Sequence, residues 1–441
     1  MTRRAPRALA VAATAAALVA APLAGATAQD AGFFLDDSWD TSADHVFVYG
    51  RFTDDVLVGD WDGDGRDTVL VRRGDTFHVS NEPRGGAAER VFRYGRAGDV
   101  VLVGDWDGDG RDTLAVRRGA QYHLRDTLGP GPADRVVVYG RAGDEVVVGD
   151  WDGDGADTLA VRRGPTYYVK NAIGPGPADR AVVYGRAEDV TLAGDWDGDG
   201  ADSLAVRRGA QYLVRDAIAP GAADRTLVYG RPDDEVLVGD WDGDGADTLG
   251  VRRLPPFRSS VVAVTAADIG SSWRPGCPVA PSGLRTVVAS HWDAEGRLRT
   301  GRVVVAAGLA RDVAAILEDL YRARFPIQRM VPVAQYGGSD AASMAANNTS
   351  AFNCRAVTGG TSFSEHAYGR AIDVNPLVNP YVVGSTVLPA AGAPYADRSR
   401  HAPGTIHPGD AVVGAFAARG WSWGGDWRSP KDYQHFSTTG R

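Results

Sequence analysis

Two pairs of histidine and aspartate in the last third of the sequence could carry chemistry. In SEHAYGRAIDV, His366 precedes Asp373 by seven residues, and in DYQHF, Asp432 precedes His435 by three. Two imidazoles and one carboxylate, with a fourth position open to water, are the ligand set of a catalytic rather than a structural zinc site. Each pair alone is also compatible with a solvated contact in a loop, so the hypothesis depends on the surrounding elements.

The segments around these residues predict a small α+β domain. RAIDV is expected to be a strand, with Asp373 on the same face as Ala371 and Ile372 pointing into the core. The small Gly369 and Ala371 are expected to leave room for the ligands. Upstream, RVVVAAGLARDVAAILEDLYRARF predicts a strand and then an amphipathic helix, whose apolar face would consist of Val313, Ile316, Leu317 and Leu320. Short strands and loops rich in glycine and proline follow, which is typical of an α+β enzyme domain.

Both motifs resemble those of one peptidase family. SEHAYGRAID matches the S-x-H-x(6)-D motif of the M15 zinc peptidases, the D-Ala-D-Ala carboxypeptidase and L-Ala-D-Glu endopeptidase group. WGGDWRSPKDYQHF matches the closing motif of that family, a carboxylate three residues before the last histidine ligand. The resemblance covers roughly residues 270 to 441. It implies that His366, Asp373 and His435 bind zinc and that Asp432 is the general base, a shorter side chain than the glutamate of many relatives.

The resemblance also implies roles for two further residues. The family uses an arginine upstream of the first ligand to stabilise the oxyanion, and NNTSAFNCR offers Arg355, for which a salt bridge is the alternative role. Ser364 corresponds to the serine two residues before the first ligand and is expected to contact the substrate or a ligand. His401 and His407 are alternative ligands, but neither has an acid at a matching distance.

The N-terminus and the two cysteines indicate an exported protein. Residues 1–28 have the charged start, short apolar stretch and Ala-Thr-Ala site of a cleaved signal peptide, although an uncleaved membrane anchor is the alternative. No later segment is expected to span a membrane, so the mature chain would be secreted, either free or associated with the cell wall. In an oxidising compartment Cys277 and Cys354 are expected to form a disulfide. The alternative is that Cys354 is a peptidase nucleophile.

The chain of 441 residues carries a net charge of -9, which argues against binding to nucleic acid. Before Leu254 the motif GDWDGDG recurs five times at a step of 45 residues, a period that suits a four-stranded propeller blade. The fifth unit lacks its fourth strand, and FFLDDSW near the start of the chain resembles that missing strand. We therefore expect a five-bladed β-propeller over residues 29–254, closed by pairing of its two ends, with an open stack of β-units as the alternative. A linker at 255–264 and the zinc peptidase domain at 265–441 would follow.

The repeated loops carry three aspartates each at alternate positions. Hard carboxylates around a glycine-rich turn suit calcium, and the loops resemble those of FG-GAP and VCBS-type propeller repeats. They depart from that pattern because the acid stands at the eighth position, Asp67, where the ninth is usual. The alternative is an Asp-Gly turn capped by its own side chains. The candidate calcium ligands are Asp60, Asp62, Asp64, Asp105, Asp107, Asp109, Asp150, Asp152, Asp154, Asp195, Asp197, Asp199, Asp240, Asp242 and Asp244.

Two functions follow from these features. The first is an exported zinc peptidase that hydrolyses stem peptides of peptidoglycan, with the propeller as a binding or spacing module. The second is a non-catalytic wall-binding or surface protein in which the propeller binds the ligand. A serine DD-peptidase is excluded because no S-x-x-K motif occurs.

Overall fold

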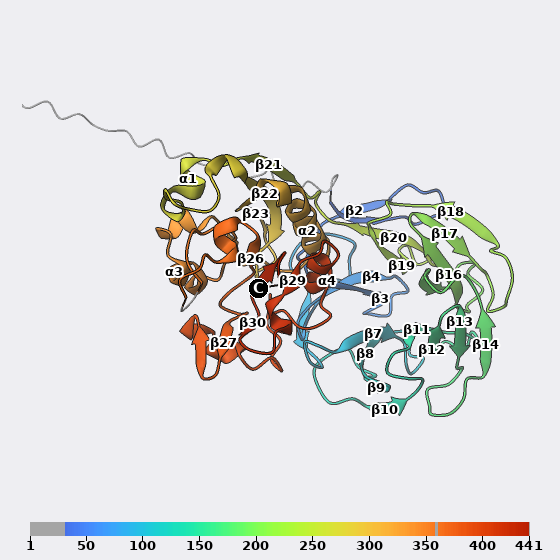
Figure 1. The fold of residues 1–441 in the computed structure, drawn as a ribbon. Helices are drawn as coiled ribbons and strands as arrows, with labels where there is room; N and C mark the ends of the chain where they lie inside the picture. The colour runs from blue at the N-terminus through green and yellow to red at the C-terminus, as the bar shows by residue number, and fades with distance from the viewer. Residues whose placement is uncertain (1–30, 358–359, 441) are drawn as a thin grey trace, which may run out of the picture.

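The computed structural model describes residues 31–357 and 360–440 (Figure 1). The predicted signal peptide, residues 1–28, lies outside the described residues. Sheets coloured blue to green form one region, and a mixed region of helices, short strands and loops follows it in yellow to red. Within the described ranges, no helix has the length and apolarity needed to cross a bilayer.

The first region consists of five four-stranded antiparallel sheets. The first sheet contains β3 (Asp55–Gly59), β4 (Thr68–Arg73), β5 (Thr76–Val79) and β6 (Arg90–Arg93). The second contains β7 (Val100–Gly104), β8 (Thr113–Arg118), β9 (Gln121–Leu124) and β10 (Arg135–Val138). The third contains β11 (Glu145–Gly149), β12 (Thr158–Arg163), β13 (Thr166–Val169) and β14 (Arg180–Val183). The fourth contains β15 (Val190–Gly194), β16 (Ser203–Arg208), β17 (Gln211–Val214) and β18 (Arg225–Val228). The fifth contains β19 (Glu235–Gly239), β20 (Thr248–Arg253), β1 (Gly32–Leu35) and β2 (His45–Phe47).

The boundary of each sheet differs from that of the sequence unit by one strand. In the sequence repeat the segment VVVYG precedes the GDWDGDG loop of its unit, but its strand β10 pairs with β9 and is therefore the outer strand of the preceding sheet. As a result two strands, not one, complete the fifth sheet from the start of the described chain. β1 pairs with β20, with Phe34 opposite Val251, and β2 pairs with β1. The predicted pairing of the strand near Phe34 with the fifth unit is confirmed.

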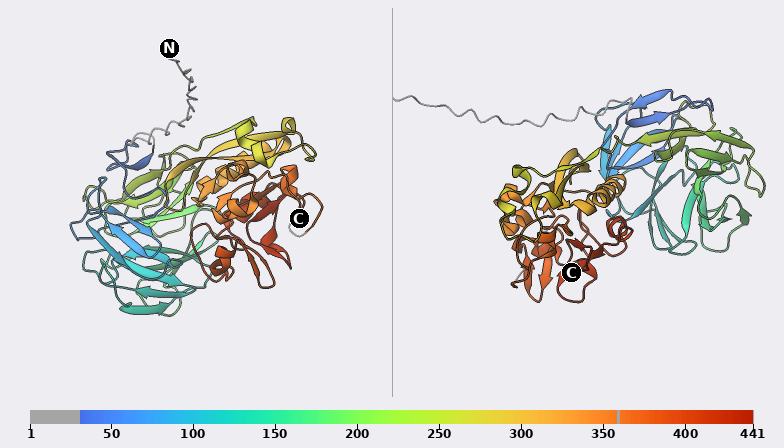
Figure 2. Two further views of the ribbon diagram at one scale, coloured as in Figure 1. Left: turned by 90° about the vertical axis from the view of Figure 1, so that its left-hand side faces the viewer. Right: turned by 45° about the horizontal axis from the view of Figure 1, so that its top comes forward.

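Neighbouring sheets are joined through the aspartate at the eighth loop position. The Asp60 backbone amide donates to Asp112 Oδ2 at 2.8 Å, and the Asp112 amide donates to the Asp60 carbonyl at 2.8 Å. The same pair of bonds links Asp240 to Asp67, at 3.0 and 2.7 Å, so the fifth sheet is bonded to the first. Strands β3, β7, β11, β15 and β19 accordingly contact one another in a cycle that returns to β3. Figure 2 gives two further views of these sheets.

The arginine pairs that end the second strands have defined partners. Arg117 donates to the carbonyls of Asp144 and Arg141 in the following unit, at 2.8 and 2.9 Å. Arg118 forms a two-pronged ion pair with Asp99, with N–O distances of 2.7 and 2.6 Å. Arg117 therefore fastens one unit to the next, whereas Arg118 ties the end of β8 to the turn before β7 within its own sheet.

The second region begins with a three-stranded sheet covered by a helix. Its strands are β21 (Ser259–Ala263), β22 (Leu284–Trp292) and β23 (Leu298–Ala306), and α2 (Ala310–Arg322) packs on β22. The expected strand and amphipathic helix are present, and all four residues of the predicted apolar face are buried. The expected linker at 255–264 is too long, because β21 lies inside it. All five β21 residues are exposed on an edge strand, so they gave no burial pattern in the sequence.

Short elements make up the rest of this region. The helices are α1 (Ala266–Ile269), α3 (Asp340–Ala345) and α4 (Ala411–Ala417), and a two-stranded sheet pairs β24 (Arg329–Met330) with β25 (Asn348–Thr349). One small sheet has the strand order β26 (Ala371–Asp373), β31 (His435–Ser437), β29 (Ser422–Trp423). A second has the order β28 (Thr386–Leu388), β27 (Tyr381–Val383), β30 (Lys431–Asp432). Cys277 and Cys354 form the predicted disulfide, so Cys354 is not a free nucleophile.

The two regions contact each other along one side. Arg322, the last residue of α2, and Arg324, two residues beyond it, form ion pairs with Asp233 and Glu235, with N–O distances of 2.6 and 3.2 Å. The ring of Phe52 lies 6.1 Å from that of Trp292. These contacts join the loops before β3 and β19 to the sheet and helix that support the second region.

Candidate metal centre

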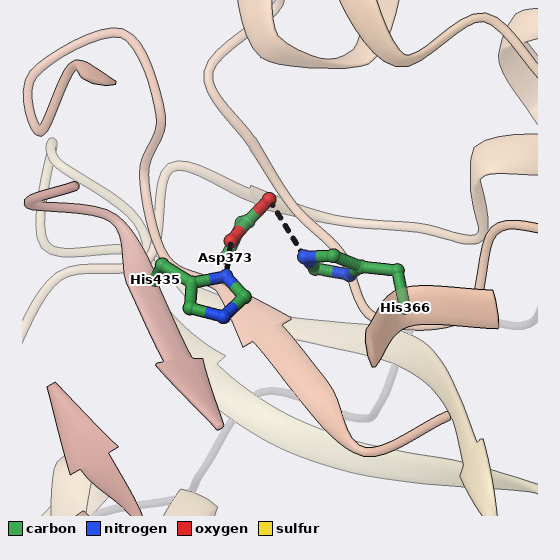
Figure 3. A group of neighbouring side chains, drawn as sticks. All are labelled: His366, Asp373 and His435. Atoms are coloured by element: carbon green, nitrogen blue, oxygen red, sulfur yellow. Dashed lines mark hydrogen bonds and ion pairs between the residues drawn. The ribbon is translucent and has the colours of Figure 1, made fainter. Parts of the chain in front are cut away.

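His366, Asp373 and His435 are brought together by three separate elements (Figure 3). His366 lies on the short 3-10 helix η5 (Glu365–Tyr368), Asp373 ends β26 and His435 begins β31. β26 and β31 are antiparallel with Asp373 directly opposite His435, so both side chains project from the same face. Ile372 points the other way into the hydrophobic core, as the RAIDV pattern predicts.

The turn around His366 fixes its ring. Ser364 caps η5 by accepting a hydrogen bond from the His366 amide at 3.4 Å. The His366 Nδ1 lies 2.6 Å from the Ala351 carbonyl, which can only accept, so Nδ1 carries the proton. The unprotonated Nε2 is left facing Asp373 Oδ2 at 3.2 Å. It makes no hydrogen bond within the described part of the chain.

Gly369 has a different role from the one we expected. It ends η5 with φ +66°, and a Cβ built on it would lie 2.6 Å from the Ala306 backbone nitrogen. A side chain there would collide with the end of β23 while also straining the backbone. Glycine is therefore required by the turn and by packing, and not by the space around the ligands.

The charge of the group suits a cation. His435 Nδ1 lies 3.0 Å from Asp373 Oδ1, and one ligand atom from each residue lies within 4.8 Å of the others. The three residues are 3–6% exposed. Burial alone would raise the pKa of Asp373, but the interactions with His366 and His435 hold it well below its ordinary value. A buried ionised carboxylate between two imidazoles, one with an unbonded nitrogen, fits a divalent metal with an open position.

Asp432 lies apart from this group, on β30, and lines the same cavity of about 520 Å³. Its Oδ1 is buried and has no hydrogen-bond partner in the described chain. Burial raises the pKa of Asp432 to about 6. His435 acts to lower this pKa, and the negative charge of Asp373 acts to raise it further. A carboxylate with such a pKa can take up and release a proton near neutral pH.

Arg355 and Ser364 also line the cavity. The Arg355 Nη2 lies 3.0 Å from Asp340 Oδ2, so the salt bridge considered as its alternative role is present at the cavity wall. His401 and His407 do not line the cavity, and their rings stack on each other at 4.3 Å. The structure thus places the predicted site residues around one cavity. Sequence reasoning missed other lining residues: Tyr381 and Leu388 belong to no motif, and Trp427 lies in the closing motif without an expected role.

The aspartate-rich loops of the first region show the geometry of the capped turn. Asp60 Oδ1 accepts from the Gly63 amide at 2.7 Å, and Oδ2 accepts from the Gly65 amide at 2.8 Å. The carboxylates of Asp60, Asp62 and Asp64 are also close enough to share a cation. The eighth-position acids are engaged by the neighbouring sheet instead, and burial raises the pKa of one of them, Asp112, to about 7.

The geometry defines a candidate metal centre in a region that follows a mostly β repeat region. Residues 358–438 match the family model described as D-alanyl-D-alanine carboxypeptidase, of the M15_4 peptidases, and this range contains all three candidate ligands and Asp432. The match supports an M15-family peptidase domain at the C-terminus. Comparison with curated proteins gives no significant match.

Solved structures give weak similarities. One is an Agrocybe aegerita lectin in a structure described as the basis of its specific recognition of non-reducing terminal N-acetylglucosamine. It is 14% identical, with 56% of this chain and 79% of that chain covered and a TM-score of 0.29. Another is BBS1N in complex with ARL6DN, at 11% identity, with 56% and 78% covered and a TM-score of 0.26. Similarities at this level carry no argument about function.

Proposed function

We propose that this protein is an exported zinc peptidase that hydrolyses peptide bonds in the stem peptides of peptidoglycan, as a D-Ala-D-Ala carboxypeptidase or an L-Ala-D-Glu endopeptidase. The observation that carries the proposal is the buried group of His366, Asp373 and His435 on the wall of a cavity that also contains Asp432. The family match over the same residues supports the peptide substrate.

His366, Asp373 and His435 would hold the zinc ion. When bound, zinc supplies a Lewis acid that polarises a carbonyl and lowers the pKa of water towards ~7. Asp432 accepts the proton of the attacking water and passes it to the leaving amine. Arg355, held by Asp340, supplies a fixed positive charge for the oxygen on which negative charge develops. Ser364 orients His366 by capping its turn.

The repeat region extends the proposal. We infer that its five sheets form a closed five-bladed β-propeller of the FG-GAP or VCBS type, which binds a wall ligand or spaces the peptidase from the surface. The cycle of contacts between the first strands and the bonds from Asp240 to Asp67 support closure. Its aspartate-rich loops would bind calcium. Export through the N-terminal signal would place the protein outside the cell.

The test compares two alanine variants of the purified protein. His366→Ala should lose both zinc and hydrolysis of muropeptides, because two protein ligands rarely retain a catalytic zinc. Asp432→Ala keeps all three ligands, so it should retain about one equivalent of zinc while turnover falls by roughly 10²–10⁴. His401→Ala is the matched control and should change neither quantity. Loss of zinc from Asp432→Ala, or unchanged turnover, would contradict the assignment, and an inactive wild-type protein would favour a non-catalytic wall-binding role.

A further inference from the structure

Tyr381 is a polar residue of the cavity to which the family motifs assign no role. It begins β27, between β28 and β30 in a three-stranded sheet. Its side chain lines the cavity together with the candidate ligands. It is partly exposed.

The register of the sheet determines where the phenol points. Tyr381 lies directly opposite Asp432 on β30 and directly opposite Leu388 on β28. Directly opposed residues of antiparallel strands project from the same face, and their Cβ atoms lie about 4.5–5.5 Å apart. All three side chains line the cavity, so they form one row across its wall. The tyrosine side chain is longer than that of aspartate, so its hydroxyl reaches further from the wall than the Asp432 carboxylate.

We propose that Tyr381 is a further catalytic residue, whose hydroxyl donates a hydrogen bond to an oxygen of the bound peptide beside the scissile bond. This inference rests on the proposed peptidase function. In the proposed reaction Asp432 accepts the proton of the attacking water. Because Tyr381 lies next to Asp432 in the row, its hydroxyl can reach the part of the substrate that reacts. Leu388, on the other side of Tyr381, supplies an apolar surface for a small side chain of the peptide.

The phenol can act only as a donor to such an oxygen at neutral pH. Burial, together with the charge of Asp432, raises the pKa of Tyr381, so the hydroxyl keeps its proton. An oxygen that gains negative charge during the reaction strengthens a hydrogen bond from a fixed donor. Because Tyr381 is partly exposed, its hydroxyl exchanges a hydrogen bond with water for one with the substrate.

The test is Tyr381→Phe, which removes the hydroxyl and leaves the ring. We expect kcat/KM for muropeptide hydrolysis to fall by roughly 10–100-fold, the loss expected for one hydrogen bond to a charged acceptor. Zinc content and melting temperature should match those of the wild type. Tyr395→Phe is the control, since Tyr395 is partly buried but lies outside the cavity, and it should retain full activity.

Three other results would overturn the role of Tyr381, and one of them would also overturn the proposed function. Unchanged kcat/KM in Tyr381→Phe, with an active wild type, overturns this inference and leaves the proposed function standing. Loss of zinc or a lowered melting temperature in Tyr381→Phe shows a structural role and also overturns it. A wild-type protein that binds zinc but hydrolyses no muropeptide overturns the proposed function, and this inference with it.

Discussion

Leu35 tests whether the first strand is an integral part of the fifth sheet. It lies on β1 opposite Gly250 and is fully buried. Leu124 occupies the equivalent place on β9, opposite Ala115, and is also fully buried, but its sheet is continuous in sequence. Truncation of a buried leucine to alanine costs about 2–5 kcal/mol. If β1 is packed as tightly as β9, Leu35→Ala and Leu124→Ala should both reduce the free energy of unfolding by that amount.

Urea unfolding followed by tryptophan fluorescence measures both values. Val46→Ala, on β2 at 43% exposure, is the control and should change stability by no more than about 0.5 kcal/mol. Deleting residues 29–44 should destabilise the whole repeat region, since it removes β1 entirely. The reasoning is refuted if Leu124→Ala shows the full loss while Leu35→Ala resembles the control, because β1 would then be a frayed end.

Two further predictions concern conditions rather than core packing. A calcium-selective chelator should lower the melting temperature of the repeat region and leave the transition of the second region in place, whereas superimposable curves would favour plain capped turns at the Asp60-type loops. Burial alone would raise the pKa of Asp293, but hydrogen bonds from Arg297 and Arg299 lower it to about 2 from 3.8. The ion pairs therefore stabilise the fold above pH ~4, by at most about 2 kcal/mol, and lose this contribution as the pH falls towards 2. The stability difference between wild type and Asp293→Asn should shrink over that range, and a constant difference would contradict it.

Two of the candidate ligands, His366 and Asp373, could be paired from sequence because they are local, whereas the distant His435 was found only through the resemblance of its motif to a known family. His366 and Asp373 are close in the chain, and a turn and a strand suffice to place them together. Tyr381 could not be predicted, because its neighbour Asp432 lies on a strand about 50 residues away and the register of two short strands leaves no pattern in the sequence. The structural need for Gly369 was equally hidden, since it comes from the backbone of β23.

The repeats were visible for a different reason. A motif such as GDWDGDG that returns at a constant step indicates equal units without any knowledge of their fold. The same periodicity cannot say where one sheet stops, because every strand recurs at that step. β10 could therefore be assigned to either neighbour, and only its pairing with β9 decides. The exposed edge strand β21 escaped notice because burial imposes no alternation on it.

The pairing of β1 with β20 also sets an order of events during synthesis. β1 is made first, but its partner ends only at Arg253, more than 200 residues later. At about 5–20 residues per second, the ribosome needs roughly 10–40 s to supply that partner. Throughout this interval β1 can pair with β2 but lacks β20, whereas the strands of the other four sheets meet within their own segment of chain. Such a non-local pairing is intrinsically slow, so the strand made first is the last to be joined.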